Sequence, residues 1–325
     1  MFRTEIKEFD TNFSISLTDP ILSMGSCFAN DIGLQLKAHK FQTQINPGGI
    51  LFNPLSLFEV LDFALDARDY PEASFVRSQS RYLNYKLHSQ INAASEDEMM
   101  AKTQANNVMA VDYLNKSKLI IFTFGTAWVY RLASNGMLVA NCHKVPQSEF
   151  TKHLLTVEEI TTAFNALKEK IEAIQPDVKF LLTVSPVRHV KDSIPLNSVS
   201  KSVLRLACHE LSQQSDNVGY FPSYEIMMDD LRDYRFYAKD LIHPNEQAVE
   251  YIWNSFAKQL FDKSTYAFVE EWSKVVSALN HKPFHPQSTE HQRFLQATIK
   301  KIENLAHQVD VSEEVAFLRA QLTEA

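Results

Sequence analysis

Cysteine and net positive charge are both scarce in this sequence. The chain has only three cysteines, with no Cys-x-x-Cys spacing: Cys27, Cys142 and Cys208. An odd number without paired spacing argues against a disulfide framework or a structural zinc site and leaves at least one thiol free. The formal net charge is -7, so the chain lacks the basic field that binds nucleic acid or anionic membranes. We therefore expect a small-molecule substrate or a partner in solution, and no nucleic acid.

Long apolar runs are also missing. No stretch approaches the roughly 20 apolar residues that span a bilayer. The opening segment, "MFRTEIKEFDTNF" (1–13), lacks the charged-then-apolar layout of a signal peptide. These absences predict a cytoplasmic protein without a membrane span.

Short apolar runs alternate with amphipathic segments over most of the chain. The apolar runs are rich in β-branched or aromatic residues, as strands are, and lie at 20–25, 41–46, 118–125, 179–185 and 218–224. The helical patterns lie at 28–40, 156–174, 196–214 and 244–261. This repeated order predicts a parallel sheet flanked by helices, and hence a three-layer α/β/α domain.

Two segments depart from that plan. Residues 55–117 form a long insertion with a helical pattern near its end, placed so that it can cover the site as a lid. Residues 129–146 hold Asn135-Gly136 between two apolar runs, which is a strong signal for a β-hairpin at the carboxyl edge of the third strand.

The chain becomes mostly helical from about residue 263. We predict a main domain at 1–262, with a helical insertion at about 55–117, and a C-terminal helical extension at 263–325. Within 293–309, apolar residues recur on one face at helical spacing. That face either packs on the main domain or forms a homodimer interface; its members are Leu295, Ile299, Ile302, Leu305 and Val309.

The stretch "SMGSCFAN" (23–30) places Gly25 and Ser26 between the first predicted strand and the first predicted helix. Ligands of open parallel sheets bind beyond the carboxyl ends of the strands, so Ser26 is a candidate nucleophile there. Gly25 relieves the steric limits of the turn, and the N–H groups of Ser26 and Cys27 can face a developing oxyanion. Two alternatives remain open: Ser26 only caps the helix, or the Cys27 thiol, acidified at a helix N-terminus, is the nucleophile.

A second stretch, "YAKDLIHPN" (237–245), carries Asp240 and His243 three residues apart in a loop that leads into a helix. A nucleophilic serine needs a base, and that base needs a carboxylate on its other nitrogen. One short Asp-x-x-His loop supplies both groups. Alone the pattern is weak because a loop aspartate often only caps the next helix, but together with Ser26 it indicates a catalytic triad.

The order of these blocks resembles the SGNH (GDSL-like) hydrolase superfamily. More narrowly, the chain resembles the GSCFA family of bacterial proteins, whose name-giving motif stands at 25–29. Other similar stretches are "NPGGILFNP" (46–54), "FTFGTAWVY" (122–130), "NCHKVP" (141–146), "TVSPVRH" (183–189) and the segment 221–244. The resemblance covers about residues 20–260 and implies a flavodoxin-like parallel sheet.

By this resemblance Ser26 is the nucleophile, His243 the general base and Asp240 its orienting partner. Gly48 or Gly49 matches the glycine whose backbone N–H serves the oxyanion hole. The superfamily's Gly-x-Asn-Asp after the third strand is replaced here by Gly125-Thr126-Ala127-Trp128, so the usual asparagine donor is missing. The candidates to replace it are the Thr126 hydroxyl and the Asn141 amide.

Other polar residues are candidate substrate contacts. We expect His143 to line the site. Arg188 and His189 follow the fourth strand and can contact an anionic group of the substrate, although an arginine in such a loop is as often only a surface residue. The sequence has no His-x-x-x-His or HExxH pair and no carboxylate cluster with metal spacing, so we expect neither a metal nor another cofactor.

Two functions are compatible with these residues. The first is a serine esterase or acyl transferase that acts on a small-molecule ester, for example a carbohydrate O-acetyl or other short-acyl ester. The second is a catalytically degenerate member that keeps the fold and works as a binding or assembly module, which the missing asparagine favours.

Overall fold

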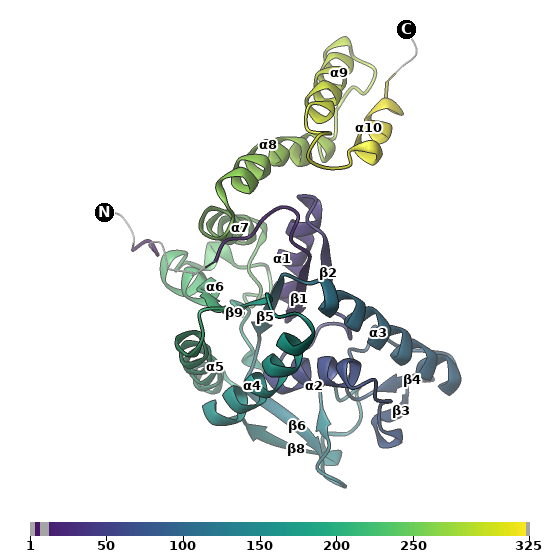
Figure 1. The fold of residues 1–325 in the computed structure, drawn as a ribbon, viewed down its shortest axis with the longest axis vertical. Coiled ribbons are helices and arrows are strands. Elements are labelled where there is room, and N and C mark those ends of the chain that lie inside the picture. The colour runs from purple at the N-terminus through teal and green to yellow at the C-terminus, as the bar shows by residue number, and fades with distance from the viewer. Residues whose placement is uncertain (1–3, 7–12, 323–325) are drawn as a thin grey trace.

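A five-stranded parallel sheet forms the centre of the main domain in the computed structural model, which describes residues 4–6 and 13–322 (Figure 1). The order across the sheet is β10-β9-β5-β1-β2, and all neighbours pair in parallel. The bounds are β1 (Ile21–Gly25), β2 (Thr43–Ile45), β5 (Leu119–Phe124), β9 (Lys179–Val184) and β10 (Val218–Phe221). Taken in chain order this is the flavodoxin-like arrangement 2-1-3-4-5, which confirms the predicted fold class.

Helices cover both faces of this sheet. Their bounds are α1 (Cys27–Ala38), α2 (Pro54–Leu65), α4 (Val157–Ile174), α5 (Ile194–Gln214) and α7 (Glu246–Leu260). Short helical turns connect them: η1 (Glu72–Ser74), η2 (Gln147–Glu149), η3 (Val190–Asp192), α6 (Ser223–Glu225), η4 (Ile226–Asp230) and η5 (Tyr234–Phe236). All four helical patterns expected between the strands are confirmed, with ends shifted by up to two residues.

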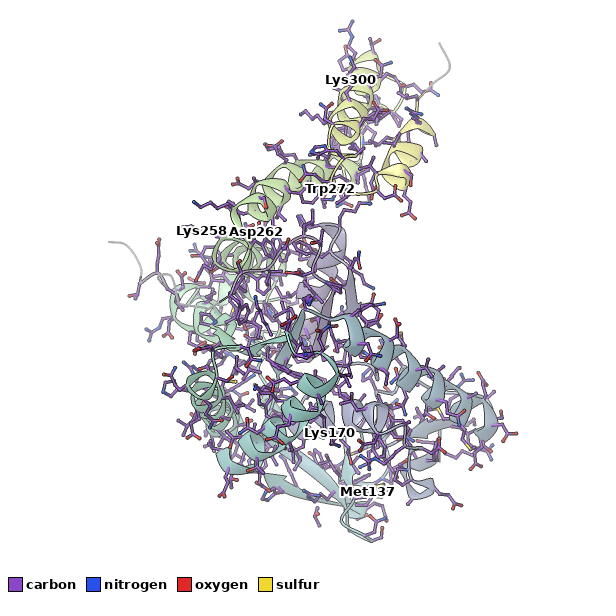
Figure 2. All side chains as sticks on the ribbon, in the orientation of Figure 1. Met137, Lys170, Lys258, Asp262, Trp272 and Lys300 are labelled. Atoms are coloured by element: carbon purple, nitrogen blue, oxygen red, sulfur yellow. The ribbon has the colours of Figure 1, made fainter. Side chains whose placement is uncertain are left out.

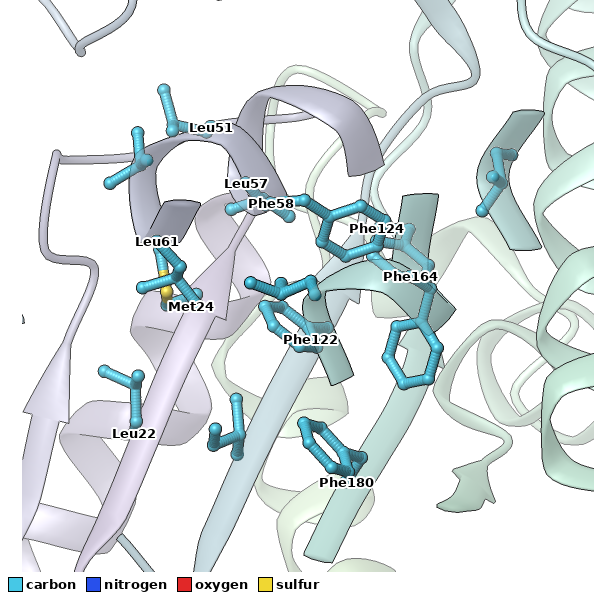
Figure 3. Close-up of a cluster of buried hydrophobic side chains, with 14 of the residues drawn as sticks. Leu22, Met24, Leu51, Leu57, Phe58, Leu61, Phe122, Phe124, Phe164 and Phe180 are labelled. Atoms are coloured by element: carbon cyan, nitrogen blue, oxygen red, sulfur yellow. The ribbon is translucent and has the colours of Figure 1, made fainter. Parts of the chain in front are cut away.

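The two sheet faces bury separate hydrophobic clusters, because successive side chains of a strand point to opposite faces. Leu22 and Phe122 belong to the cluster beneath α2 and α4, where the Phe58 ring meets Phe122 edge to face at 5.4 Å (Figure 3). Ile21 and Ile121 belong to the cluster on the α1 and α7 side. A strand buried on both faces reads as a continuous apolar run, which is why "LIIFTF" in β5 shows no polar alternation.

The insertion between β2 and β5 is only partly helical. It contains α2, an antiparallel hairpin of β3 (Phe75–Ser78) and β4 (Arg81–Asn84), and α3 (Glu96–Lys116). The Ser95 hydroxyl caps α3 by accepting from the Glu98 N–H at 3.3 Å. The amide oxygen of Asn106 in α3 accepts the Gly48 N–H at 2.8 Å, so this insertion holds the loop after β2.

A small antiparallel sheet follows β5. Its strands are β6 (Trp128–Leu132), β7 (Leu138–Val139) and β8 (Phe150–Leu154), in the order β7-β6-β8. The β6–β7 pair turns at Asn135-Gly136, where Gly136 has φ 73° and its N–H donates to Leu132 O. The predicted hairpin is therefore confirmed.

Three helices at the C-terminal end stand apart from the sheet: α8 (Lys263–Leu279), α9 (Thr289–Glu303) and α10 (Ser312–Arg319) (Figure 1). The expected apolar face of α9 is present, with Leu295 and Ile302 almost fully buried. Helices α8 and α10, rather than the sheet layer, pack against α9. The homodimer interface stays a prediction.

Trp272 of α8 joins this extension to the main domain (Figure 2). Its indole N–H donates to Ala38 O at the end of α1 at 2.9 Å, and the Lys40 ammonium lies 5.3 Å from its ring centre. The Asp262 carboxylate caps the start of α8 by accepting from the Thr265 N–H at 2.8 Å.

All three cysteines are free. Within 4–6 and 13–322, no helix is long and apolar enough to cross a membrane. Most of the segment 1–13, which lacks a signal-peptide layout, lies outside the described residues. The last three residues of the predicted extension, 323–325, also lie outside them.

Gly25 sets the turn between β1 and α1. Its φ is 145°, and a Cβ atom there would lie 2.2 Å from the carbonyl oxygen of Thr123 in β5. Only glycine tolerates both the backbone angle and this approach. The contact brings the N–H of Ser26 to 3.1 Å from the same oxygen.

We expect Gly25→Ala to lower the free energy of unfolding by about 3 kcal/mol or more, because the methyl group forces the two central strands apart. Gly136→Ala is the matched control: its φ is also positive, but nothing lies within 4 Å of its Cβ position. Its cost is about 1 kcal/mol, from backbone strain alone. Urea unfolding of both variants measures the difference, and equal losses would contradict the steric explanation.

Candidate functional site

Ser26 occupies the N-cap position of α1, but its side chain does not cap the helix. The residue is only 1% exposed, and its Oγ has no hydrogen-bond partner in the described part of the chain. A buried hydroxyl without a partner is costly, so each such group in a native structure needs an explanation. Capping, the structural alternative for Ser26, does not supply one.

Asp240 and His243 form a close pair in the loop before α7. The Nδ1 atom of His243 lies 2.7 Å from Oδ2 of Asp240, while Oδ1 accepts the backbone N–H groups of Ile242 and His243. These N–H groups, that of His243 foremost, lower the pKa of Asp240 to about 2, so the carboxylate stays ionised. Holding Nδ1 in this way leaves Nε2 of His243 as the nitrogen that can serve a substrate or a nucleophile.

The triad is not closed in this structure. No hydrogen bond joins Ser26 Oγ to His243 among the described residues. The loop that carries His243 is nevertheless held at the segment that follows β9, where the Arg188 N–H donates to Ile242 O at 3.3 Å. The pair and the serine therefore occupy the same end of the sheet without a hydrogen bond between their side chains in the described part of the chain.

Cys27 shows the opposite of an activated thiol. Burial raises its pKa above the ordinary value, and the nearby Asp31 carboxylate raises it further. The favourable position at a helix N-terminus is therefore outweighed, and the thiol stays protonated at neutral pH.

Several of the expected oxyanion donors are bonded elsewhere. The Ser26 N–H donates to Thr123 O at 3.1 Å. The Gly48 N–H donates to Asn106 Oδ1 and the Gly49 N–H to Asn46 O, each at 2.8 Å, so the expectation that either serves the oxyanion hole is not supported by this structure. The Thr126 hydroxyl is also engaged. It lies 3.1 Å from Ser200 Oγ and accepts the Trp128 N–H at 3.1 Å.

A hollow of about 400 Å³ opens beside this site. Phe52, Thr126 and His189 lie at its lining, and Trp128 and Tyr130 add aromatic surface. Asn141 and His143 of the predicted set also line it. The His143 ring is fixed by a 2.8 Å hydrogen bond between Nε2 and Asn84 O, and burial lowers its pKa.

Arg188 points elsewhere. Its guanidinium donates to the Tyr237 hydroxyl at 3.0 Å and stacks over that ring at 4.6 Å. It lines a separate hollow of about 330 Å³ together with Met227 and Arg232. The structure thus separates Arg188 from its neighbour His189, although the two are adjacent in sequence.

Comparison of the sequence with models of protein families shows which family the chain belongs to. The model of the GSCFA family matches residues 20–256, which is most of the sequence. The chain belongs to the GSCFA family. A second model, described as the GSCFA domain protein C-terminal domain, matches residues 272–324. No curated protein shows significant similarity to the chain.

The GSCFA domain gathers its motifs at one edge of the sheet. Gly25 ends β1 and Ser26 follows it, Gly48 and Gly49 follow β2, and Gly125 follows β5. Within 4–6 and 13–322, no group of three His, Cys, Asp or Glu side chains is arranged to hold a metal ion.

Lys201 is a residue of this site that sequence reasoning missed. It lies on α5, is 2% exposed, and its ammonium donates to Gly125 O at 2.8 Å and Ser185 O at 2.7 Å. It thereby ties together the ends of β5 and β9. The signal was present in the sequence, because Lys201 falls on the buried face of α5 at helical spacing from Asn197, Leu204 and Cys208.

Burial lowers the pKa of Lys201 to about 7 from an ordinary value of 10.5. Between these values the unfolded chain binds a proton that the folded protein does not, so the free energy of unfolding rises as pH increases through this window. We expect Lys201→Met to lack this rise. Urea unfolding of both proteins from about pH 6 to about pH 9 tests it. Parallel stability curves would show that the buried amine does not titrate there.

Proposed function

We propose that this GSCFA protein is a serine esterase of the SGNH type, acting on a small-molecule ester with Ser26, His243 and Asp240 as its triad. The observation that carries the proposal is the fixed Asp240–His243 pair at the same sheet edge as a buried, non-capping serine. An imidazole with a carboxylate on Nδ1 is the arrangement that a serine nucleophile requires. The similarity of the motif order to SGNH hydrolases supports the same assignment.

The reaction follows from these groups. Ser26 Oγ attacks the ester carbonyl carbon while Nε2 of His243 takes the hydroxyl proton, and Asp240 stabilises the imidazolium that forms. Collapse of the tetrahedral intermediate breaks the bond to the alcohol oxygen, which takes the proton back from His243. Water then attacks the acyl-enzyme by the same route and releases the acid. An acceptor alcohol in place of water would make the reaction an acyl transfer.

Closing the triad requires a local rearrangement. The Asp240 and His243 side chains are 47% and 43% exposed, so a substrate can reach the pair from solvent. Ser26 Oγ is buried beneath its neighbours, and those neighbours must shift to admit an ester. Catalytic hydrogen bonds are often long or absent before substrate binds, so an open triad is compatible with activity.

The hollow beside the site indicates the substrate class. Its volume of about 400 Å³ suits a small molecule, and its wall combines the rings of Trp128 and Tyr130 with the polar side chains of Asn141 and Gln147. Aromatic faces with amide groups suit a hydroxylated ligand. A carbohydrate O-acetyl or other short-acyl ester fits this wall.

A binding module without catalysis is the second candidate. The occupied N–H groups of Gly48 and Gly49 favour it, because a serine hydrolase that lacks oxyanion donors loses about 10² to 10³ in turnover per donor. In this function the fold and the hollow are retained, and the helices α8 to α10 serve as a surface for assembly or homodimer formation.

We expect the protein to hydrolyse p-nitrophenyl acetate in a Ser26-dependent manner. Ser26→Ala removes turnover, and His243→Ala lowers it by roughly 10² to 10⁴, because the base is lost. Cys27→Ala retains turnover, since the protonated thiol takes no part. Circular dichroism of each variant checks that the fold is intact. Activity that survives Ser26→Ala but not Cys27→Ala would reassign the nucleophile, and none above the Ser26→Ala background would favour the binding module.

A further Asp240→Asn variant tests the pair. Because Asp240 holds the tautomer of His243, we expect kcat to fall by about 10² to 10⁴ with KM little changed. The matched control is Asp233→Asn, in the preceding segment, where the carboxylate accepts the backbone N–H of Arg235 at 2.8 Å and bonds to no histidine among the described residues. Equal losses of kcat in the two variants would show that the loss comes from a disturbed loop structure and not from the His243 tautomer.

A further inference from the structure

We propose that His189 supplies the missing oxyanion donor of this site, with its neutral imidazole donating Nε2–H to the ester oxygen as that oxygen becomes negative. The inference rests on the proposed function and names a catalytic residue for it. The third-strand asparagine that normally makes this hydrogen bond is absent, and Gly48, Gly49 and Thr126 donate or are bonded elsewhere.

The first observation is the position of the His189 imidazole ring. Nε2 of His189 and Cβ of Ser26 each lie 3.3 Å from the point that a Cβ atom on Gly125 would occupy. The imidazole nitrogen and the serine therefore both border the space that the absent side chain of Gly125 leaves at the end of β5. A tetrahedral carbon on Ser26 Oγ would place its oxygen in this narrow region.

The hydrogen bonding of the His189 Nε2 atom is the second observation. His189 Nε2 is buried and has no hydrogen-bond partner among the residues that the structure describes. The Oγ of Ser26, whose Cβ borders the same space at Gly125, is also buried without a partner. Two buried polar atoms without partners are costly in a folded protein, and a ligand that bonds to both relieves the cost.

The charge of the ring decides between donor and base. Burial, followed by the positive charge of Lys201, lowers the pKa of His189 to about 4, so the ring is neutral under ordinary conditions. A neutral imidazole with such a low proton affinity is a poor base but a good neutral donor. His243, with its carboxylate partner, keeps the role of base.

The ring is also held in place. The backbone N–H of His189 donates to Asn197 Oδ1 at 2.8 Å, and the ring meets Phe52 edge to face at 5.0 Å. The carbonyl of Phe52 accepts the N–H groups of Gly125 and Thr126, at 2.7 and 3.0 Å. One packed unit therefore links the donor to the strand end that carries it, as an oriented oxyanion donor requires.

Two substitutions measure the donor. His189→Phe keeps a planar ring without an N–H, and we expect it to lower kcat for p-nitrophenyl acetate by about 10² to 10³ with KM little changed. His189→Gln carries an amide N–H to nearly the same place, so it recovers at least about tenfold of that loss. His209→Phe makes the same change on the exposed face of α5 and serves as the control. Thermal unfolding of all three checks that they fold.

A second measurement does not depend on turnover. In ¹⁵N-resolved NMR of the wild-type protein, His189 must be the neutral Nε2–H tautomer at neutral pH. An Nδ1–H tautomer, or a His189→Phe enzyme as fast as wild type, would overturn the assignment and leave the esterase standing. Absence of Ser26-dependent turnover in the wild type would instead remove the esterase and this role together.

Discussion

The close approach of β1 to β5 at Gly25 is the constraint on which the rest of the site depends. A Cβ atom at Gly25 would lie 2.2 Å from Thr123 O, so the two central strands can meet there only because the side chain is missing. The same approach brings the Ser26 N–H onto that carbonyl and starts α1 immediately beyond it. Ser26 thereby becomes a rigid, buried residue at the sheet edge instead of a loop residue in water.

The loop after β2 completes this framework. The Asn46 side chain accepts the Gly25 N–H at 2.8 Å, and the Leu51 N–H donates to Gly25 O at 3.1 Å. Farther along, Phe52 O holds the turn at Gly125. A single segment thus fixes both strand ends between which a substrate oxygen would lie. The Gly48 and Gly49 N–H groups of this segment donate to Asn106 and Asn46, so the "PGG" turn has a structural role here.

Electrostatics at the site come from two unlike sources. Asp240 is exposed and ionised, and it orients an exposed histidine; Lys201 is buried, and described carbonyl oxygens rather than a carboxylate accept its hydrogen bonds. The cost of burying an ammonium is high, and it is offset only in part by those two hydrogen bonds. The lysine also joins the ends of two strands, and its charge adds to the effect of burial in lowering the pKa of the nearby His189 imidazole.

Much of this protein is determined by the sequence alone. The periodicities predict the five parallel strands, the flanking helices and the hairpin at Asn135-Gly136, because burial on two faces, one face or neither leaves different apolar patterns. The Asp-x-x-His spacing likewise predicts the Asp240–His243 contact, since a four-residue loop can hardly place the two side chains far apart. Motif similarity gives the family.

Only the tertiary structure decided which groups are free to act. Whether a backbone N–H such as that of Gly48 is available depends on Asn106, which is 58 residues away along the chain. The divergence of Arg188 from His189, the burial of Lys201 and the packing of the α9 face against α8 and α10 likewise depend on contacts between distant segments. Local sequence patterns indicate which residues are buried. The hydrogen-bond partners of buried groups depend on which distant segments pack against them, so they follow only from the tertiary structure.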